Sequence, residues 1–407
     1  MAVRQIPTLL LTGYLGSGKT TLVNRILSNR KGIKFAVIVN DIGEVNIDAD
    51  LIQQGGIVGQ NDDSLVALQN GCICCTLKMD LVQQLKEITS MQKFDYIVIE
   101  ASGICEPEPI ARTICTYPRM GMEYYKDGLA RLDCIVTVVD ALRLQDEFGC
   151  GENLVKKDLK EDDLESLVIQ QIEFCNIVLL NKASEVSAQE RERIKQIIRA
   201  LQPKAEIIEC DYGDVDFDKI LNTKMFDFDE VATSATWIQA IEGGVDVEEE
   251  HEHHHHDDDD DDDDDEHEEG HHHHHHDHDH EGGEVEEYGI GTFVYYRRRP
   301  FHLGKFDEFV ARKLPRNVIR VKGICYFRDE EDICYVFEQA GKQIQLRNAG
   351  QWFATMPADE LRDMMEREPG LRRDWDPVYG DRMEKLVFIG QHMDKEAIVK
   401  ALDECLV

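Results

Sequence analysis

The chain has 407 residues, enough for about two or three domains, and 42% of them are hydrophobic, which is ample for packed cores. Its 81 acidic residues outnumber the 45 Lys and Arg residues, and the net charge of −36 argues against nucleic acid as the main partner, because phosphate backbones bind basic surfaces. No apolar run reaches the roughly 18 residues that span a membrane, and residues 1–7 are too few and too polar for a signal peptide, so we expect a cytoplasmic protein without a membrane partner.

The first 235 residues alternate between short apolar runs and segments with helical spacing. Strands are predicted over 8–12, 35–40, 96–100, 134–140 and 177–181, and helices over 19–29, 77–91 and 188–201. Strands that alternate with helices favour an α/β fold, with a mainly parallel sheet covered on both faces. We expect this domain to span 1–235.

The first predicted strand leads into the segment 13–20, Gly-Tyr-Leu-Gly-Ser-Gly-Lys-Thr, which fits the P-loop pattern G-x-x-x-x-G-K-[ST]. In this position the glycines let backbone N–H groups converge on phosphate oxygens, and the start of the following helix adds positive potential. We expect Lys19 to reach the β- and γ-phosphates and Thr20 to bind Mg²⁺; a glycine-rich turn without a ligand is the alternative. The candidate nucleotide-binding residues here are Gly13, Gly16, Ser17, Gly18, Lys19, Thr20 and Thr21.

Three cysteines, Cys72, Cys74 and Cys75, lie within four residues just before the helix predicted over 77–91. Thiolates are ligands for Zn²⁺ and similar ions, and a helix N-terminus would lower the thiol pKa values. The alternatives are buried structural cysteines and a redox site, although the spacing differs from the C-x-x-C of dithiol exchangers. The cluster predicts a metal site.

The predicted strand 96–100 ends in Glu100, and Gly103 follows three residues later. An NTPase needs an acid at the end of a nearby strand to hold Mg²⁺ or its water shell. We expect Glu100, together with Lys19, to support hydrolysis, and the Gly103 N–H to contact the γ-phosphate. Asp140, at the end of another strand, is a second candidate for the acid, and a solvated strand-end carboxylate is the alternative for Glu100.

Polar residues also follow the apolar run of the predicted strand 177–181, where the sequence reads Asn181-Lys182-Ala183-Ser184. An N-K-x-D tetrad here would read guanine, with Asn on the base edge, Lys along the ring and Asp on N1 and N2. Ser184 stands where the acid should be, and Glu185 comes one residue late. Asn181 and Lys182 are therefore expected at the nucleotide, while the choice between GTP and ATP is left open.

The stretch 242–287 holds 24 acidic residues, 14 of the 16 histidines and no Lys or Arg, so the rest of the chain has a net charge of −12. Such a segment has little to bury and repels itself, which predicts a disordered linker over 236–288. Neutral imidazoles suit Zn²⁺, Ni²⁺, Co²⁺ and Cu²⁺, so we expect an accessory metal store; a solubilising linker and an expression tag are the alternatives. The candidate accessory ligands are His253, His254, His255, His256, His271, His272, His273, His274, His275 and His276.

Regular structure is predicted to resume at residue 289. Strands are expected over 292–296, 318–325, 333–337, 342–346 and 385–390, and helices over 305–313, 359–367 and 394–406. This pattern favours an α+β domain over 289–407.

These motifs together resemble the CobW-type P-loop GTPases, a family that includes zinc and cobalt metallochaperones and nitrile hydratase activators. In the first domain, the resemblance rests on the P-loop with Thr21 and on five further motifs: N-D-I-G-E-V at 40–45, G-C-I-C-C at 71–75, E-A-S-G at 100–103, V-V-D-A at 138–141 and Asn181-Lys182. Beyond the acidic stretch, it rests on the segments 297–301, 321–323 and 380–390. It implies a SIMIBI-type GTPase domain with an appended C-terminal α+β domain. It also implies that Cys72, Cys74 and Cys75 bind Zn²⁺, or Co²⁺ or Ni²⁺, with Glu44 as a further metal contact.

We therefore expect a Mg²⁺-dependent GTPase with slow turnover that carries a transition metal to a client metalloprotein. The chain between Asn40 and Cys75 is the expected switch, ordered by the γ-phosphate and released on hydrolysis. The alternatives are a metal buffer that works through the histidine-rich stretch and a metalloenzyme activator of the nitrile hydratase type. A homo-oligomer is left open.

Overall fold

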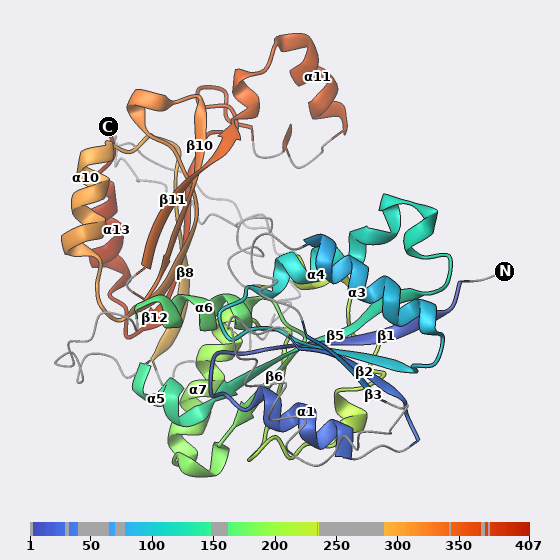
Figure 1. Cartoon of the computed structure of the whole chain (residues 1–407). Helices are drawn as coiled ribbons and strands as arrows, with labels where there is room; N and C mark the ends of the chain where they lie inside the picture. Colours follow the sequence, from blue (N-terminus) through green and yellow to red (C-terminus); the bar gives the residue numbers. More distant parts are fainter. Residues whose placement is uncertain are drawn as a thin grey trace, which may run out of the picture.

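The computed structural model contains two β-sheets, each packed against helices (Figure 1). It describes residues 3–28, 32–39, 65–69, 78–147, 162–233, 235, 289–341, 343–367, 371–372 and 375–407. Across these ranges, no helix is both long and apolar enough to cross a bilayer.

The first sheet has seven strands in the order β3-β2-β4-β1-β5-β6-β7, and every neighbouring pair is parallel. The strands are β1 (Gln5–Thr12), β2 (Phe35–Val39), β3 (Leu65–Gln69), β4 (Tyr96–Glu100), β5 (Leu129–Asp140), β6 (Ile177–Asn181) and β7 (Glu206–Glu209). The helices are α1 (Lys19–Ser28), α3 (Lys78–Met91), α4 (Pro107–Thr116), α5 (Ala141–Glu147), α6 (Asp162–Glu173), α7 (Ala188–Leu201) and α8 (Phe228–Thr233). The predicted α/β fold with a mainly parallel sheet is confirmed.

Both faces of the inner part of this sheet are buried, which explains why β2, β4 and β6 are almost wholly apolar. Along β1, Leu9 and Leu11 point into the core that α1 covers, whereas Leu10 points into the core formed with α3, α4, α6 and α7. The carboxyl ends of all seven strands lie on one edge, since all run in the same direction. Every predicted nucleotide contact follows one of these strand ends.

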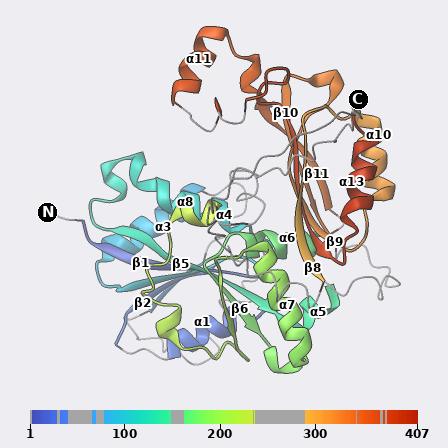
Figure 2. The same ribbon diagram turned by 180° about the vertical axis from the view of Figure 1, so that it is seen from behind.

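The second sheet is antiparallel, with the order β11-β10-β9-β12-β8. Its elements are β8 (Ile290–Arg297), α10 (Leu303–Glu308), β9 (Val318–Cys325), β10 (Ile333–Ala340), β11 (Gln343–Gln351), α11 (Ala358–Arg367), β12 (Glu384–Gln391) and α13 (Lys395–Asp403). Phe306 of α10 and Leu402 of α13 pack on this sheet, and Figure 2 shows both helices along the face turned away from the first sheet. The two sheets fall within the predicted ranges 1–235 and 289–407, whose boundaries stay a prediction.

The helix predicted over 305–313 is present, but it changes type along its length. The segment 305–313 is not a single α-helix: α10 begins earlier, at Leu303 after a cap by His302, and ends at Glu308, and a π turn then covers Phe309–Lys313. The wider turn lets Phe309 join Phe306 in the buried core of the second sheet.

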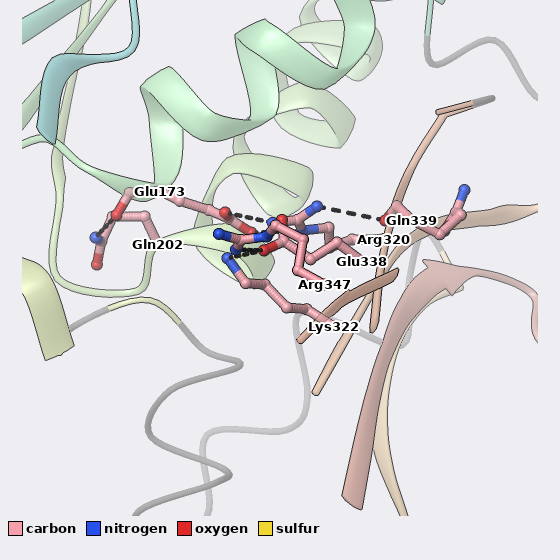
Figure 3. A network of polar contacts seen from close by, with 7 residues as sticks. All are labelled: Glu173, Gln202, Arg320, Lys322, Glu338, Gln339 and Arg347. Atoms are coloured by element: carbon pink, nitrogen blue, oxygen red, sulfur yellow. Dashed lines mark hydrogen bonds and ion pairs between the residues drawn. The ribbon is translucent and has the colours of Figure 1, made fainter. Parts of the chain in front are cut away.

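The two sheets meet through α6 and the strands β9 and β10. Ile319 of β9 and Ala340 of β10 belong to the same apolar cluster as Ile169 and Ile172 of α6. Beside this cluster, a group of charged side chains joins Glu173 at the end of α6 to the second sheet (Figure 3). The halves therefore share both an apolar contact and buried ion pairs.

Candidate functional site

The phosphate loop connects β1 to α1 and contains glycines that no other residue could replace without strain. Gly13 has φ +133°, and a Cβ there would lie 2.2 Å from the Val138 carbonyl oxygen of β5. Gly18 has φ +110°, and its Cβ would lie 2.4 Å from Nδ2 of Asn181. The loop is therefore held closely against β5 and the end of β6.

Lys19, at the start of α1, folds over this loop. It is only 5% exposed, and its Nζ donates a hydrogen bond to the Tyr14 carbonyl at 3.1 Å. The hydroxyl of Ser17 is buried and has no hydrogen-bond partner among the described residues. Gly103 lies on the other side, where a Cβ would come within 2.6 Å of the Leu15 backbone nitrogen. The loop thus has an ammonium group, a hydroxyl and the Gly103 backbone around it, as an anion site requires.

Thr20 and Glu100 are brought together although 80 residues separate them. The Thr20 hydroxyl donates to Oε1 of Glu100 at 2.8 Å, and Glu100 is 1% exposed at the end of β4. A hydroxyl beside a carboxylate, next to the phosphate loop, is an oxygen donor set that suits Mg²⁺. The two residues therefore fit the ion that the family implies.

Asp140, the second candidate for the acid, has other contacts. It forms an ion pair with Lys182 and accepts a hydrogen bond from the Arg143 backbone N–H at 3.2 Å. Of the two candidate acids, Glu100 is the one hydrogen-bonded to Thr20.

At the end of β6, the amide of Asn181 connects two loops. Its Nδ2 donates to the Ser17 carbonyl at 2.8 Å, and its Oδ1 accepts from the Gly213 N–H at 3.1 Å. Lys182 adopts a left-handed conformation, with φ 57°, and its ammonium group pairs with Asp140. Asn181 thus contacts the phosphate loop directly, whereas the ammonium group of Lys182 lies at Asp140, at the end of β5.

The sequence analysis missed one residue of this region. Asp211, just beyond β7, accepts hydrogen bonds on Oδ1 from the backbone N–H of Ser184 at 3.0 Å and from its hydroxyl at 2.9 Å. The only signal in the sequence was an acid following Ile207 and Ile208, and these two apolar residues are too few to identify a strand.

Several predicted residues cannot be placed. Glu44, Cys72, Cys74, Cys75 and the histidines 253–256 and 271–276 lie outside the described residues. Within the described ranges, no three His, Cys, Asp or Glu side chains are grouped as metal ligands. Thr21 lies on α1 with an exposed side chain, and Gly16 has φ +82° at the tip of the phosphate loop.

Two family models match the chain. Residues 7–209 match the CobW/HypB/UreG nucleotide-binding domain, and residues 290–406 match the cobalamin synthesis protein CobW C-terminal domain. The chain is 32% identical over 418 residues to the zinc-regulated GTPase metalloprotein activator 1 of Dictyostelium discoideum, covering 99% of this chain and 80% of that protein.

The chain is also similar to a bacterial protein, in sequence and in structure. The chain is 30% identical over 234 residues to the zinc chaperone YjiA of Escherichia coli, covering 56% of this chain and 65% of that protein, just under two thirds of its length. A crystal structure of zinc-bound YjiA GTPase from E. coli matches with a TM-score of 0.39 and 19% identity, over 99% of this chain and all of that one.

Proposed function

Since the chain belongs to the CobW family of P-loop GTPases, we propose that it is a GTP-hydrolysing metallochaperone. In this proposal it binds GTP at the phosphate loop, holds one Zn²⁺ ion as cargo at Cys72, Cys74 and Cys75, and passes the ion to a client metalloprotein. The names of the relatives, a zinc-regulated metalloprotein activator and a zinc chaperone, support zinc over cobalt or nickel.

The observation that carries the proposal is the hydrogen bond between Thr20 and Glu100 beside Lys19. On nucleotide binding, the Lys19 ammonium exchanges the Tyr14 carbonyl for phosphate oxygens, which carry full negative charge. Thr20 and Glu100 would hold the Mg²⁺ ion or its water shell, and the ion would supply positive charge to the β- and γ-phosphates. The Gly103 N–H, packed against the loop, is the contact proposed to respond to the γ-phosphate.

The thiol motif follows β3 in the chain and precedes α3. β3 ends at Gln69 and α3 begins at Lys78, and β3 runs parallel to β2, β4 and β1. The chain therefore leaves β3 toward Cys72 at the same edge of the sheet from which the phosphate loop leaves β1. Thiolates bind Zn²⁺ more readily than Mg²⁺, so the two ions would be sorted by ligand chemistry.

The test measures zinc affinity by competition with a chromogenic chelator, in the presence of GDP or of a non-hydrolysable GTP analogue. For the full chain we expect affinities that differ about tenfold between the two nucleotide states. Lys19→Ala should remove this difference, and replacing Cys72, Cys74 and Cys75 with serine should remove one tightly bound ion per chain. Equal affinity in both nucleotide states would contradict nucleotide-controlled delivery and favour a metal buffer.

A client assay separates delivery from buffering. Zinc transfer from the loaded protein to an apo-metalloenzyme should be faster with GTP than with GDP, and Lys19→Ala should transfer at the GDP rate in both cases. A transfer rate in Lys19→Ala equal to that of the unmodified chain with GTP would contradict the proposal.

A further inference from the structure

We propose that Asp211 supplies the carboxylate that reads the N1 and N2 edge of guanine, in place of the acid that Ser184 replaces. The inference rests on the proposed function, because it names the residue that selects the base at the same nucleotide site.

Ser184 and Asp211 come from the ends of two neighbouring strands. β6 and β7 are parallel, with Leu180 opposite Glu209, so the segments that follow them begin side by side. Oδ1 of Asp211 accepts hydrogen bonds from the Ser184 N–H at 3.0 Å and from the Ser184 hydroxyl at 2.9 Å. The carboxylate of Asp211 therefore lies one hydrogen bond from the residue position where an N-K-x-D motif carries its acid.

Both of these hydrogen bonds end on the same oxygen. Within the described residues, Oδ2 of Asp211 accepts no hydrogen bond, and the side chain is half-buried. Ser184 is exposed, and its hydroxyl and backbone N–H orient the carboxylate. One oxygen is thus held in place while the other is available to a ligand.

The turn that carries Asp211 is attached to the phosphate loop. Asp214 N–H donates to the Asp211 carbonyl at 3.0 Å, which closes the turn, and Gly213 N–H donates to Asn181 Oδ1. The same Asn181 amide donates to the Ser17 carbonyl of the phosphate loop. A nucleotide whose phosphates occupy that loop would therefore have its base close to this turn.

The chemistry of the two purines makes an acid at this position selective. Guanine presents two adjacent donors, N1–H and the N2 amine, and the available oxygen of the Asp211 carboxylate, Oδ2, has two lone pairs with which to accept them. Adenine has an unprotonated N1 and no N2 amine, so its N1 lone pair would face the carboxylate. The Ser184 hydroxyl is uncharged, so it accepts hydrogen bonds more weakly than a carboxylate does, and its own hydrogen is already donated to Asp211.

The experiment measures the binding of GTP, ATP and xanthosine triphosphate to the full chain and to two variants. Xanthine carries a carbonyl in place of the N2 amine, so Asp211→Asn, which replaces one acceptor with a donor, should bind GTP about 10- to 100-fold more weakly and xanthosine triphosphate more tightly. Asp214→Asn, an exposed acid of the same turn, is the matched control and should bind GTP as the unmodified chain does. The exchange variant Ser184→Asp with Asp211→Ser should recover GTP preference.

Each outcome decides the inference. Loss of GTP binding together with the gain of xanthosine triphosphate in Asp211→Asn supports it. An Asp211→Asn variant that keeps full preference for GTP, or that weakens GTP without gaining xanthosine triphosphate, overturns it while leaving the proposed GTP-driven metal transfer intact. An unmodified chain that binds ATP as tightly as GTP overturns both this inference and the guanine part of the proposed function.

Discussion

Each half of the molecule buries a glutamate at the first or last residue of a strand, and the two carboxyl groups have different surroundings. Glu100, at the end of β4, accepts a hydrogen bond from a threonine hydroxyl beside the phosphate loop. Glu384, at the start of β12, is fully buried and accepts only backbone N–H groups, from Phe301 at 3.2 Å and Tyr326 at 3.4 Å. The first carboxylate lies beside a loop suited to a charged ligand, whereas the second has no cation among its hydrogen-bond partners in the described chain.

Removing either member of the Thr20–Glu100 pair should impair hydrolysis more than nucleotide binding. We expect Thr20→Ala and Glu100→Gln to lower the rate of phosphate release at saturating GTP by about 100-fold or more, since each removes an oxygen aligned at the site of developing charge. Thr116→Ala, which removes an exposed hydroxyl of α4, is the matched control. Wild-type rates in both site variants would contradict the assignment.

Glu384 predicts a particular dependence of stability on pH. Burial raises the pKa of this carboxyl well above its ordinary value of 4.5, although the N–H groups of Tyr326 and Phe301 act against the rise. The folded state therefore binds the proton more tightly than the unfolded state, so this group supports folding fully below pH 4.5 and progressively less as the pH rises. Glu384→Gln, which cannot ionise, should gain stability relative to the unmodified chain between about pH 5 and 8.

Thermal unfolding of Glu384→Gln and of the unmodified chain, measured at about pH 5 and about pH 8, checks this prediction. Glu404→Gln is the control, because Glu404 is exposed and a hydrogen bond from Lys313 holds its pKa below the ordinary value, so this carboxyl stays ionised in the folded state between pH 5 and 8. A difference between Glu384→Gln and the unmodified chain that stays constant with pH would show that Glu384 does not titrate differently in the folded state.

At the scale of elements, the contact between α6 and the second sheet depends on a buried arginine. Arg320 of β9 is 1% exposed and pairs with both oxygens of Glu173, at 2.9 and 3.0 Å, while one of its nitrogens lies 3.5 Å from Glu338 (Figure 3). Lys322 and Arg347 also contact Glu338, at 3.1 and 2.6 Å. Burial opposes ionisation of Glu338, but Lys322 and Arg320 keep its pKa below the ordinary value.

The two arginines of this group should differ sharply when replaced. Arg320→Met leaves Glu173 as a buried carboxylate without its cation, which should lower the free energy of unfolding by about 3–5 kcal/mol. Arg347→Met removes a cation that contacts the same Glu338 but is 63% exposed, so we expect a change of about 0–1 kcal/mol. Urea unfolding of both variants measures the difference, and equal losses would contradict a special role for the buried pair.

The bounds of several strands and helices could be predicted because their apolar residues form a clear pattern that stops at polar residues. The observed bounds of β4, β6, α7 and β9 are those expected from the sequence. β7 was not predicted, since Glu206–Glu209 is an edge strand with only two apolar residues. The order of the antiparallel strands could not be predicted either, because pairing between distant segments leaves no local signal.

In the candidate site, too, residues in local motifs could be predicted, whereas contacts between distant segments could not. The phosphate loop, Glu100 and Asn181 follow recognisable local motifs, and the structure brings them to one edge of the sheet. Ser184 and Asp211 are 27 positions apart and meet only because their strands pair, so the sequence around Ser184 could not predict Asp211 as its partner. A motif in the sequence predicts the contacts of one loop, whereas a contact between two loops can be found only once the fold shows which strands are neighbours.

At the scale of the whole molecule, the family matches confirm the resemblance to CobW-type GTPases, the P-loop fold and the GTPase class. The metal carried, the client and the roles of individual site residues stay predictions. So does the role of the histidine-rich stretch 251–280, which lies outside the described residues.

That stretch can be tested apart from the thiol motif. A chain lacking residues 248–281 should lose several weak zinc sites and keep the one that depends on Cys72, Cys74 and Cys75. The weak sites of the intact chain should disappear below about pH 6.5, where imidazoles become protonated. Calorimetric titration with zinc at pH 7.5 and 5.5, before and after the deletion, measures both effects; unchanged stoichiometry would contradict a metal store.

The order of the parallel strands has a consequence for signalling. β6 and β7, whose ends carry Asn181 and Asp211, lie at one border of the sheet, and β3, which precedes the cysteines in the chain, lies at the other. Two of the four strands between them, β4 and β1, lead to Glu100 and the phosphate loop. Under the proposed roles, guanosine without phosphates should bind beside β6 and β7 but leave the zinc affinity of the thiol motif unchanged, because it does not occupy the phosphate loop that follows β1.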